Sequence, residues 1–205
     1  MQQWDEMEAF MIAEAERDLM AGSDVRPCFT AFAGTTPLVL AFVRPFAKGG
    51  YQQPLIELLA LAAPLDADRL KLSITGRAWS MLDPIPPIDP ELGDLRQRVL
   101  TIESVDGHNG YPRSSSVLLP FDVAAGVIVW GEPTRTTSGE GWIPFAFHRT
   151  VRMRHTFQGA RVEDIRAQAE RCAGLGHLIA LGPTVAARLH GSAHSGRHRG
   201  RQDGA

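Results

Sequence analysis

The sequence predicts an α+β fold arranged as an α/β sandwich, in which helices pack on a central, mostly antiparallel sheet of five to six strands. Apolar residues recur four apart over residues 4–21, which is typical of an amphipathic helix. Residues 38–43 are apolar at consecutive positions, as in a strand that is covered on both faces. Apolar and polar residues alternate over 70–75, which indicates a strand with one solvated face. Helices are therefore expected on at least part of both faces of the sheet.

The predicted elements follow one another in the order α-β-β-α-β-β-β-β-α-α. After the first helix come a hairpin of strands at 27–33 and 37–43, a helix at 52–63, strands at 70–75, 98–105, 115–121 and 127–130, and helices at 143–154 and 162–181. Residues 83–90 hold four prolines and are predicted to form a loop, because proline removes hydrogen-bond donors and restricts its neighbours.

This order of elements resembles that of Roadblock- and longin-type domains, whose sheets likewise hold a hairpin, a helix and a meander. The resemblance concerns the order of elements and no shared motif. It therefore implies a fold and no activity.

Composition predicts one folded unit with a tail. Apolar residues make up 44% of the chain and charged residues 21%, close to the average of globular domains. Because no repeat or clean linker divides them, residues 1–189 are expected to form a single α+β domain. Residues 190–205 are rich in Arg, His and Gly and are expected to be disordered, because they contain too little apolar surface to offset the entropy of ordering.

The sequence also predicts a cytoplasmic protein that does not enter membranes. The first 24 residues are acidic, unlike a secretory signal peptide. The longest apolar runs, 38–43 and 58–63, are far shorter than the roughly 18 residues of a membrane span. Cys28 and Cys172 show no metal-ligand spacing, so both are expected to be buried as small apolar side chains.

The leading interpretation is a non-enzymatic, intracellular interaction or regulatory module. The compact motifs of common hydrolases, nucleotide-binding proteins and zinc enzymes are absent. Residues 1–100 carry 9 Lys and Arg against 14 Asp and Glu, whereas residues 101–205 carry 12 against 9. An acidic first helix could therefore meet a basic C-terminal region across two subunits, which predicts a protein partner or a homo-oligomer.

An alternative interpretation is a small enzyme whose site is spread over loops at strand ends. Arg44, Arg77, Asp106 and His108 each follow a predicted strand. Such loops commonly carry catalytic groups, and a carboxylate beside an imidazole is a minimal acid-base pair. Asp106-Gly107 is equally well explained as turn chemistry.

A third interpretation is a nucleic-acid-binding protein that uses the basic helix at 148–155. Five basic side chains cluster there: His148, Arg149, Arg152, Arg154 and His155. Guanidinium groups bind phosphates through paired hydrogen bonds. The isoelectric point near 6.4 disfavours this interpretation, and a basic stripe is more often a solvated helix face.

No metal and no cofactor are expected. His190, His194 and His198 are spaced four apart, which in a helix would place three imidazoles on one face. The surrounding Gly and Ser disfavour a helix, so this tract is interpreted as solvated, compositionally biased sequence.

Overall fold

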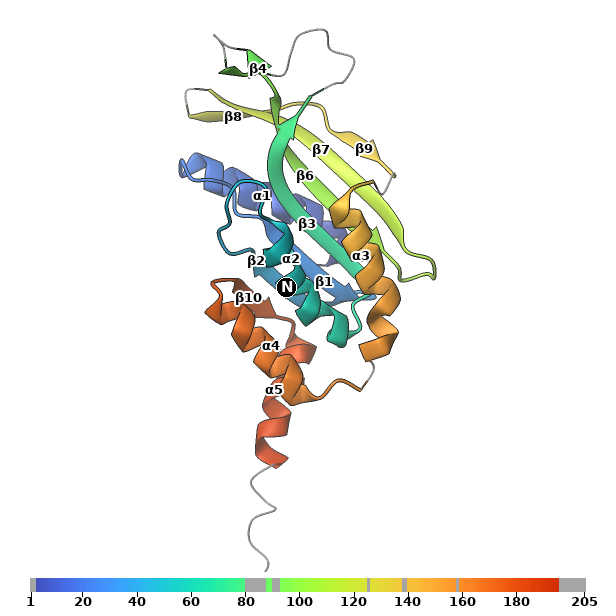
Figure 1. Ribbon diagram of the computed structural model, residues 1–205. Helices are drawn as coiled ribbons and strands as arrows, with labels where there is room; N and C mark the ends of the chain where they lie inside the picture. The colour runs from blue at the N-terminus through green and yellow to red at the C-terminus, as the bar shows by residue number, and fades with distance from the viewer. Residues whose placement is uncertain are drawn as a thin grey trace, which may run out of the picture.

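A computed structural model of the chain describes residues 3–79, 88–89, 93–124, 126–137, 140–157 and 159–195, apart from the side chains of residues 89, 93 and 191–195. Its centre is a curled antiparallel sheet with the strand order β10-β2-β1-β3-β6-β7-β8, and β9 pairs with β7 (Figure 1). The strands of this sheet are β1 (Cys28–Ala33), β2 (Thr36–Phe42), β3 (Arg69–Ala78), β6 (Gln97–Asp106), β7 (Arg113–Ala124), β8 (Val127–Trp130), β9 (Thr134–Thr136) and β10 (Leu178–Leu181). A separate short hairpin pairs β4 (Ile88–Asp89) with β5 (Gly93–Asp94).

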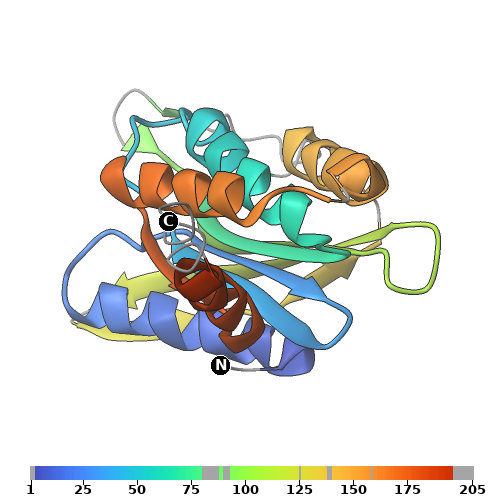
Figure 2. The same ribbon diagram turned by 90° about the horizontal axis from the view of Figure 1, so that it is seen from below.

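Helices cover both faces of the sheet. They are α1 (Met7–Met20), α2 (Gln52–Ala62), α3 (Trp142–Met153), α4 (Val162–Gly174) and α5 (Pro183–Ser195), with single 3-10 turns at Trp4–Glu6, Ala63–Leu65 and Arg154–Phe157. Helix α1 lies on one face, and α2, α3 and α4 lie on the other (Figure 2). Each face has its own apolar core: Met11 and Leu19 of α1 pack over Leu100 and Phe121, whereas Leu58 and Phe147 pack on the opposite side.

The first hairpin forms as its sequence predicts. Strands β1 and β2 pair from Cys28 opposite Phe42 to Ala33 opposite Thr36. Gly34 has φ 56° in the turn, a left-handed conformation that glycine adopts without a steric penalty. Strand β1 is buried over most of its length because β2 and β3 flank it and helices cover both of its faces.

The α+β class and the antiparallel sheet are confirmed, but the strand number of five to six is wrong. The main sheet contains eight strands, of which the two short strands β9 and β10 are additional to those that the sequence predicts. Strand β9 is the polar segment Thr-Arg-Thr, so no apolar pattern in the sequence indicates that it pairs with β7. The predicted element order α-β-β-α-β-β-β-β-α-α is therefore not confirmed. The short strands β4 and β5 lie between β3 and β6, β9 precedes α3, and β10 and α5 follow α4.

Strand β10 also corrects the predicted helix at 162–181. Helix α4 ends at Gly174, and Gly176 has φ 101°, while the His177 N–H bonds back to the Cys172 carbonyl. This arrangement is a common helix ending. The chain then pairs Leu178–Leu181 with β2. A short apolar run does not distinguish helix from strand, and the free edge of β2 decides the outcome.

The last helix of the structure extends past residue 189, after which the sequence predicts that the tail begins. Helix α5 continues to Ser195 and places Val185 and Leu189 in the core. Residues 196–205 and most of the predicted proline-rich loop at 83–90 lie outside the described residues. Within the described part of the chain, no helix is long and apolar enough to cross a membrane.

Candidate functional site

The site lies at the start of strand β1, where its neighbour β3 continues beyond the pairing with β1. Cys28, the first residue of β1, pairs with Ser73 of β3. Strand β3 runs on to Ala78 and pairs with β6 as far as Gln97. Among the described residues, Ile74 to Ala78 therefore have a strand neighbour on one side only, and the loop after β2 lies across the gap (Figure 1).

A cavity of about 950 Å³ occupies this gap, and we call it the β3-edge cavity. Its walls come from the loop before β1, the loop after β2, strands β3, β6 and β7, and the turn before β10. The residues that line it include Asp24, Arg26, Phe42, Arg44, Pro45, Lys48, Ile74, Thr75, Gly76, Arg77, Arg98 and Phe121. Its volume is within the range of ligand-binding clefts, roughly 300–1,000 Å³.

The cavity surrounds the edge of β3. Successive side chains of a strand point to opposite faces of the sheet. Ile74 and Gly76 belong to one face, and Thr75 and Arg77 belong to the other, yet all four line the cavity. A cavity that reaches both faces of one strand must pass around its unpaired edge.

Cationic side chains dominate the polar lining of the β3-edge cavity. Five line it, namely Arg26, Arg44, Lys48, Arg77 and Arg98, against the single carboxylate of Asp24. Arg26 pairs with Asp18 at 2.8 Å, Arg44 with Glu57 at 2.8 Å, and Arg77 with Asp94 at 3.6 Å. Within the described residues, Lys48 and Arg98 have no carboxylate within 4.0 Å.

Aromatic rings hold two of these guanidinium groups in place. Arg26 lies 4.5 Å from the centre of the Phe42 ring, and Arg98 lies 4.6 Å from that of Phe121. A cation over a ring face is attracted by the ring quadrupole and keeps its N–H donors available. Arg77 and Arg98 are also directly opposite in the pairing of β3 with β6. Like charges in this position repel, and an anion bound between them would relieve the repulsion.

A buried network fixes the loop that carries Arg44. Glu57 of α2 accepts hydrogen bonds from the Arg44 guanidinium at 2.8 and 3.0 Å and from Gln53 at 3.2 Å. The His177 ring is fully buried, and its Nε2 lies 2.9 Å from Glu57 Oε2. The Arg44 N–H donates to His177 Nδ1 at 3.2 Å, so Nε2 carries the ring proton and donates to Glu57.

The same contacts set the charge of Glu57. The hydrogen bonds from Arg44, followed by that from His177, lower the pKa of Glu57 to about 2 against the opposing effect of burial. The pKa of Arg44 is raised, first by its hydrogen bond to Glu57. Both groups are therefore ionised near neutral pH, and the ion pair ties the wall of the cavity to α2.

The structure separates the four residues of the predicted dispersed site. Arg44 and Arg77 line the β3-edge cavity. Asp106 and His108 lie at the other end of the sheet, because Asp106 pairs with Arg69 at the start of β3. Arg77 follows Arg69 by eight positions along β3, or roughly 26 Å at about 3.3 Å per residue. The four side chains do not share one cavity.

Asp106 and His108 do not form an acid-base pair with each other. Asp106 Oδ1 accepts hydrogen bonds from Arg69 Nε at 3.1 Å and from the backbone N–H of His108 at 2.9 Å. The His108 ring instead pairs with Asp68, with 3.1 Å between Nδ1 and Oδ2. The turn interpretation of Asp106-Gly107 explains these backbone contacts.

The basic cluster at 148–155 is divided among several contacts. His148 bonds to Ser114 of β7 at 2.6 Å, and Arg152 lies 5.8 Å from the centre of the Tyr111 ring. Arg154 pairs with Asp66 at 3.4 Å. Arg149 lines an apolar groove between α2 and α3, and His155 also has an interaction partner. The five side chains are therefore divided among separate contacts on α3 and the 3-10 turn that follows it.

The hydrogen bond between Ser114 and His148 was not predicted from the sequence. It joins β7 to α3, and no motif marks the two residues, which are 34 positions apart. Burial, followed by the charge of Arg152, lowers the pKa of His148. Because the Ser114 side chain is buried, this contact is best explained as packing between the helix and the strand.

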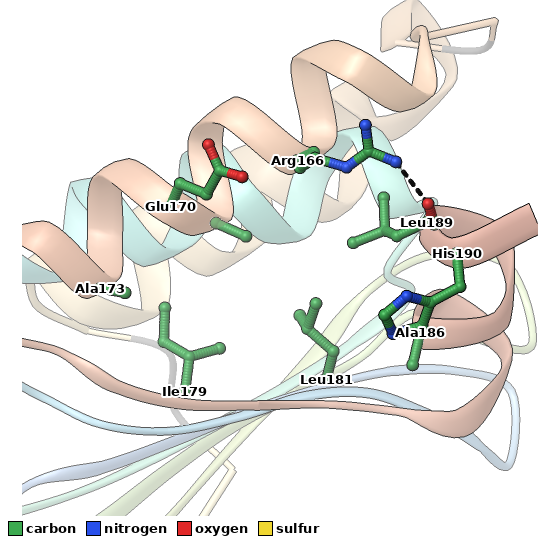
Figure 3. Close-up of a pocket in the computed structure, with 9 residues that line it drawn as sticks. Arg166, Glu170, Ala173, Ile179, Leu181, Ala186, Leu189 and His190 are labelled. Atoms are coloured by element: carbon green, nitrogen blue, oxygen red, sulfur yellow. Dashed lines mark hydrogen bonds between the residues drawn. The ribbon is translucent and has the colours of Figure 1, made fainter. Parts of the chain in front are cut away.

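Two further cavities are less polar. One, of about 440 Å³, lies between α4, β10 and α5, where Ile179 and Leu181 point toward α4 and Arg166 donates to the Leu189 carbonyl (Figure 3). His190 lines this cavity, whereas the side chain of His194 and all of His198 lie outside the described part. The other is the groove between α2 and α3, about 420 Å³, beside the exposed ring of Phe145.

The acidic side of α1 forms its contacts within the chain. Glu8 pairs with Arg135 of β9, Asp18 with Arg26, and Glu16 accepts a hydrogen bond from Trp130 at 2.7 Å. Glu8 and Asp18 thus have cationic partners within the chain, and Glu16 has a neutral hydrogen-bond donor. Among the described residues, no group of three or more His, Cys, Asp or Glu is arranged to hold a metal ion.

The sequence alone did not identify Arg26 and Arg98 as site residues, because they lie far apart in the chain and belong to no motif.

The fold is that of an antiparallel α+β protein with helices on both faces of the sheet. Comparisons with protein-family models, with curated proteins and with solved structures find no match to this chain.

Proposed function

We propose that this protein is a non-enzymatic binding module for a negatively charged ligand, and that the β3-edge cavity is its binding site. The observation that carries the proposal is the convergence of five cationic side chains from four separate segments of the chain in one cavity. Guanidinium groups bind carboxylates and phosphates through paired, charge-assisted hydrogen bonds. A concave surface with one dominant charge also raises the local concentration of the opposite charge.

The chemistry of the lining supports binding without catalysis. Of the described residues in the cavity wall, Asp24 is the one carboxylate, and none is a histidine or cysteine. The nearby His177 is buried, and both of its ring nitrogens are engaged, with the Arg44 N–H and with Glu57. General acid-base catalysis requires a group that can reach the proton it transfers. An enzyme built on Arg44, Arg77, Asp106 and His108 is disfavoured because these residues do not meet.

Titration calorimetry with anionic probes tests the proposal. The probes are a short glutamate-rich peptide and a single-stranded oligonucleotide of the same net charge, each measured at low and high salt. The variant is Lys48→Glu with Arg98→Glu, which reverses the two cations that have no carboxylate partner among the described residues. The control is Arg113→Glu, an exposed arginine at the opposite end of the sheet.

We expect at least one probe to bind, with an affinity that falls as salt screens the charges. The double variant should weaken this binding by about tenfold or more, since it removes two attractive charges and adds two repulsive ones. Arg113→Glu should leave it nearly unchanged. The proposal is wrong if neither probe binds, or if the Arg113 variant loses as much affinity as the cavity variant.

A further inference from the structure

We propose that the ligand of the β3-edge cavity is an extended acidic peptide segment of another protein, which adds as a strand to the free edge of β3 at Ile74–Ala78. This inference rests on the proposed function and specifies its ligand. In a strand, every second residue directs its N–H and C=O toward the same neighbour. The residues of this stretch that face away from β6 have no strand partner among the described residues.

Next to this edge, β2 and β3 are one strand apart where β1 lies between them. Where β1 is present, β2 and β3 lie on either side of it, about 10 Å apart at roughly 4.8 Å per strand spacing. Just before β1, the Pro27 carbonyl still accepts a backbone hydrogen bond from the Val43 N–H, which follows β2, at 2.8 Å. Before Pro27, the chain leaves the sheet toward α1 and its place beside β3 is taken by the cavity.

The β2 side of the gap offers few backbone donors to a ligand. The Arg44 N–H already donates to His177, and Pro45 has no N–H. On the other side, Gly76 is exposed, and a Cβ built on it would meet nothing within 4 Å. An added strand would therefore form its ladder with β3, where the backbone is accessible.

The charges of the cavity select an acidic occupant. A strand at this edge would direct alternate side chains to opposite faces of the sheet. On the face of α1 they would meet Arg77 and Arg98. On the other face they would lie near Arg44 and Lys48, in the loop that leads into α2. The C-terminal residues 196–205 of this chain carry three Arg against one Asp, so their charge does not match the cavity.

Selective N-methylation of a peptide tests strand addition directly. The probe is a short peptide in which glutamate and valine alternate, prepared in two forms that are N-methylated at alternate residues in opposite phases. N-methylation removes a hydrogen-bond donor and leaves the charge unchanged. In one phase the lost donors would face β3, and in the other they would face away.

We expect one N-methylated form to lose about tenfold or more in affinity and the other to bind within about threefold of the parent peptide. The parent peptide should also slow amide hydrogen exchange within residues 74–78, whereas exchange of the distant pairing between β10 and β2 should stay unchanged.

If the two N-methylated forms lost the same affinity, the proposal that the peptide adds as a strand would be wrong. It would also be wrong if the peptide did not slow amide hydrogen exchange in residues 74–78. If the parent peptide still bound in a manner sensitive to Lys48→Glu with Arg98→Glu, the anion-binding function would remain and only the strand geometry would be wrong. If the oligonucleotide bound and the peptide did not, the acidic peptide would be excluded as the ligand. Failure of both probes would overturn both proposals.

Discussion

Glu57 of α2 and His177, in the turn before β10, are joined by a buried hydrogen bond of 2.9 Å between Glu57 Oε2 and His177 Nε2. Arg44 contacts both residues, through its side chain to Glu57 and its backbone N–H to His177. One carboxylate thus connects a helix, an edge strand and the loop that forms a wall of the β3-edge cavity. This network links the stability of the fold to the geometry of the site.

Replacing Glu57 with glutamine should destabilise the fold by about 2 kcal/mol, because the Arg44 guanidinium would lose its charged partner. The free energy of unfolding from urea titrations measures the effect. Glu170→Gln is the matched control, since Glu170 is exposed on α4, and it should change the stability by less than about 0.5 kcal/mol. Equal stabilities of the two variants would contradict the assigned role of Glu57.

The stability of the protein should depend on the charge of Glu57 at acidic pH. Its pKa is lowered from an ordinary value of 4.5 to about 2, first by the Arg44 hydrogen bonds. A carboxyl with a lowered pKa in the folded state contributes stability above its unfolded pKa, and this contribution is lost as the pH falls through the folded pKa. We therefore expect a loss of stability from about pH 4.5 to about pH 2.

Urea unfolding at several pH values, compared between the natural protein and Glu57→Gln, isolates this contribution. The pKa values of Glu8, Asp18 and Asp164 are also lowered, by contacts with arginine side chains, and they act in both proteins alike. The variant should therefore show the shallower pH dependence. The same slope in both proteins would show that Glu57 is not the group responsible.

Gly182 should not tolerate a side chain. Its N–H donates to the Leu38 carbonyl at 2.8 Å, and a Cβ added there would lie 1.8 Å from the Pro37 carbonyl oxygen. Gly182→Ala must push the end of β10 away from β2, at a cost of about 2–3 kcal/mol in unfolding free energy. Thermal or urea unfolding measures the loss.

Gly174→Ala is the control for this substitution, because nothing lies within 4 Å of an added Cβ at the end of α4. This variant should be as stable as the natural protein, or more stable by up to about 1 kcal/mol, since alanine favours the helix. A destabilised Gly174 variant together with a tolerated Gly182 variant would contradict the packing at β10.

Both cysteines should be unreactive in the folded protein. Cys28 and Cys172 are buried, as their sequence context predicts, and burial raises the pKa of Cys28 to about 12 and raises that of Cys172. The thiolate is the reactive form, so labelling with a thiol reagent near pH 8 should be negligible. Unfolding in guanidinium should expose both thiols, and rapid labelling of the folded protein would contradict their burial.

Local patterns predicted those elements whose burial is periodic. The four-residue repeat of Met7, Met11 and Ala15 and the apolar run of β2 depend on neighbouring residues in the chain, so they are visible without knowledge of the fold. Strands β9 and β10 are short, and the backbone of a distant strand supplies their partners. No local pattern marks such pairing, which is why the number of strands was underestimated.

The sequence by itself determined the α+β class, the burial of both cysteines, and the position of Arg44 shortly after a strand. Arg77, predicted to follow a strand at 70–75, lies within β3 instead, because pairing with β6 extends that strand to Ala78. Only the tertiary structure decided which of the predicted residues meet. The antiparallel pairing of β3 with β6 places Asp106 and His108 at the opposite end of the sheet from Arg77. The same pairing brings Arg98 to the site. Because β1 begins only at Cys28, β3 has no partner on that side beyond Ser73 among the described residues, and the cavity lies there. Strand length and register therefore assemble the site, and both arise from contacts between distant parts of the chain.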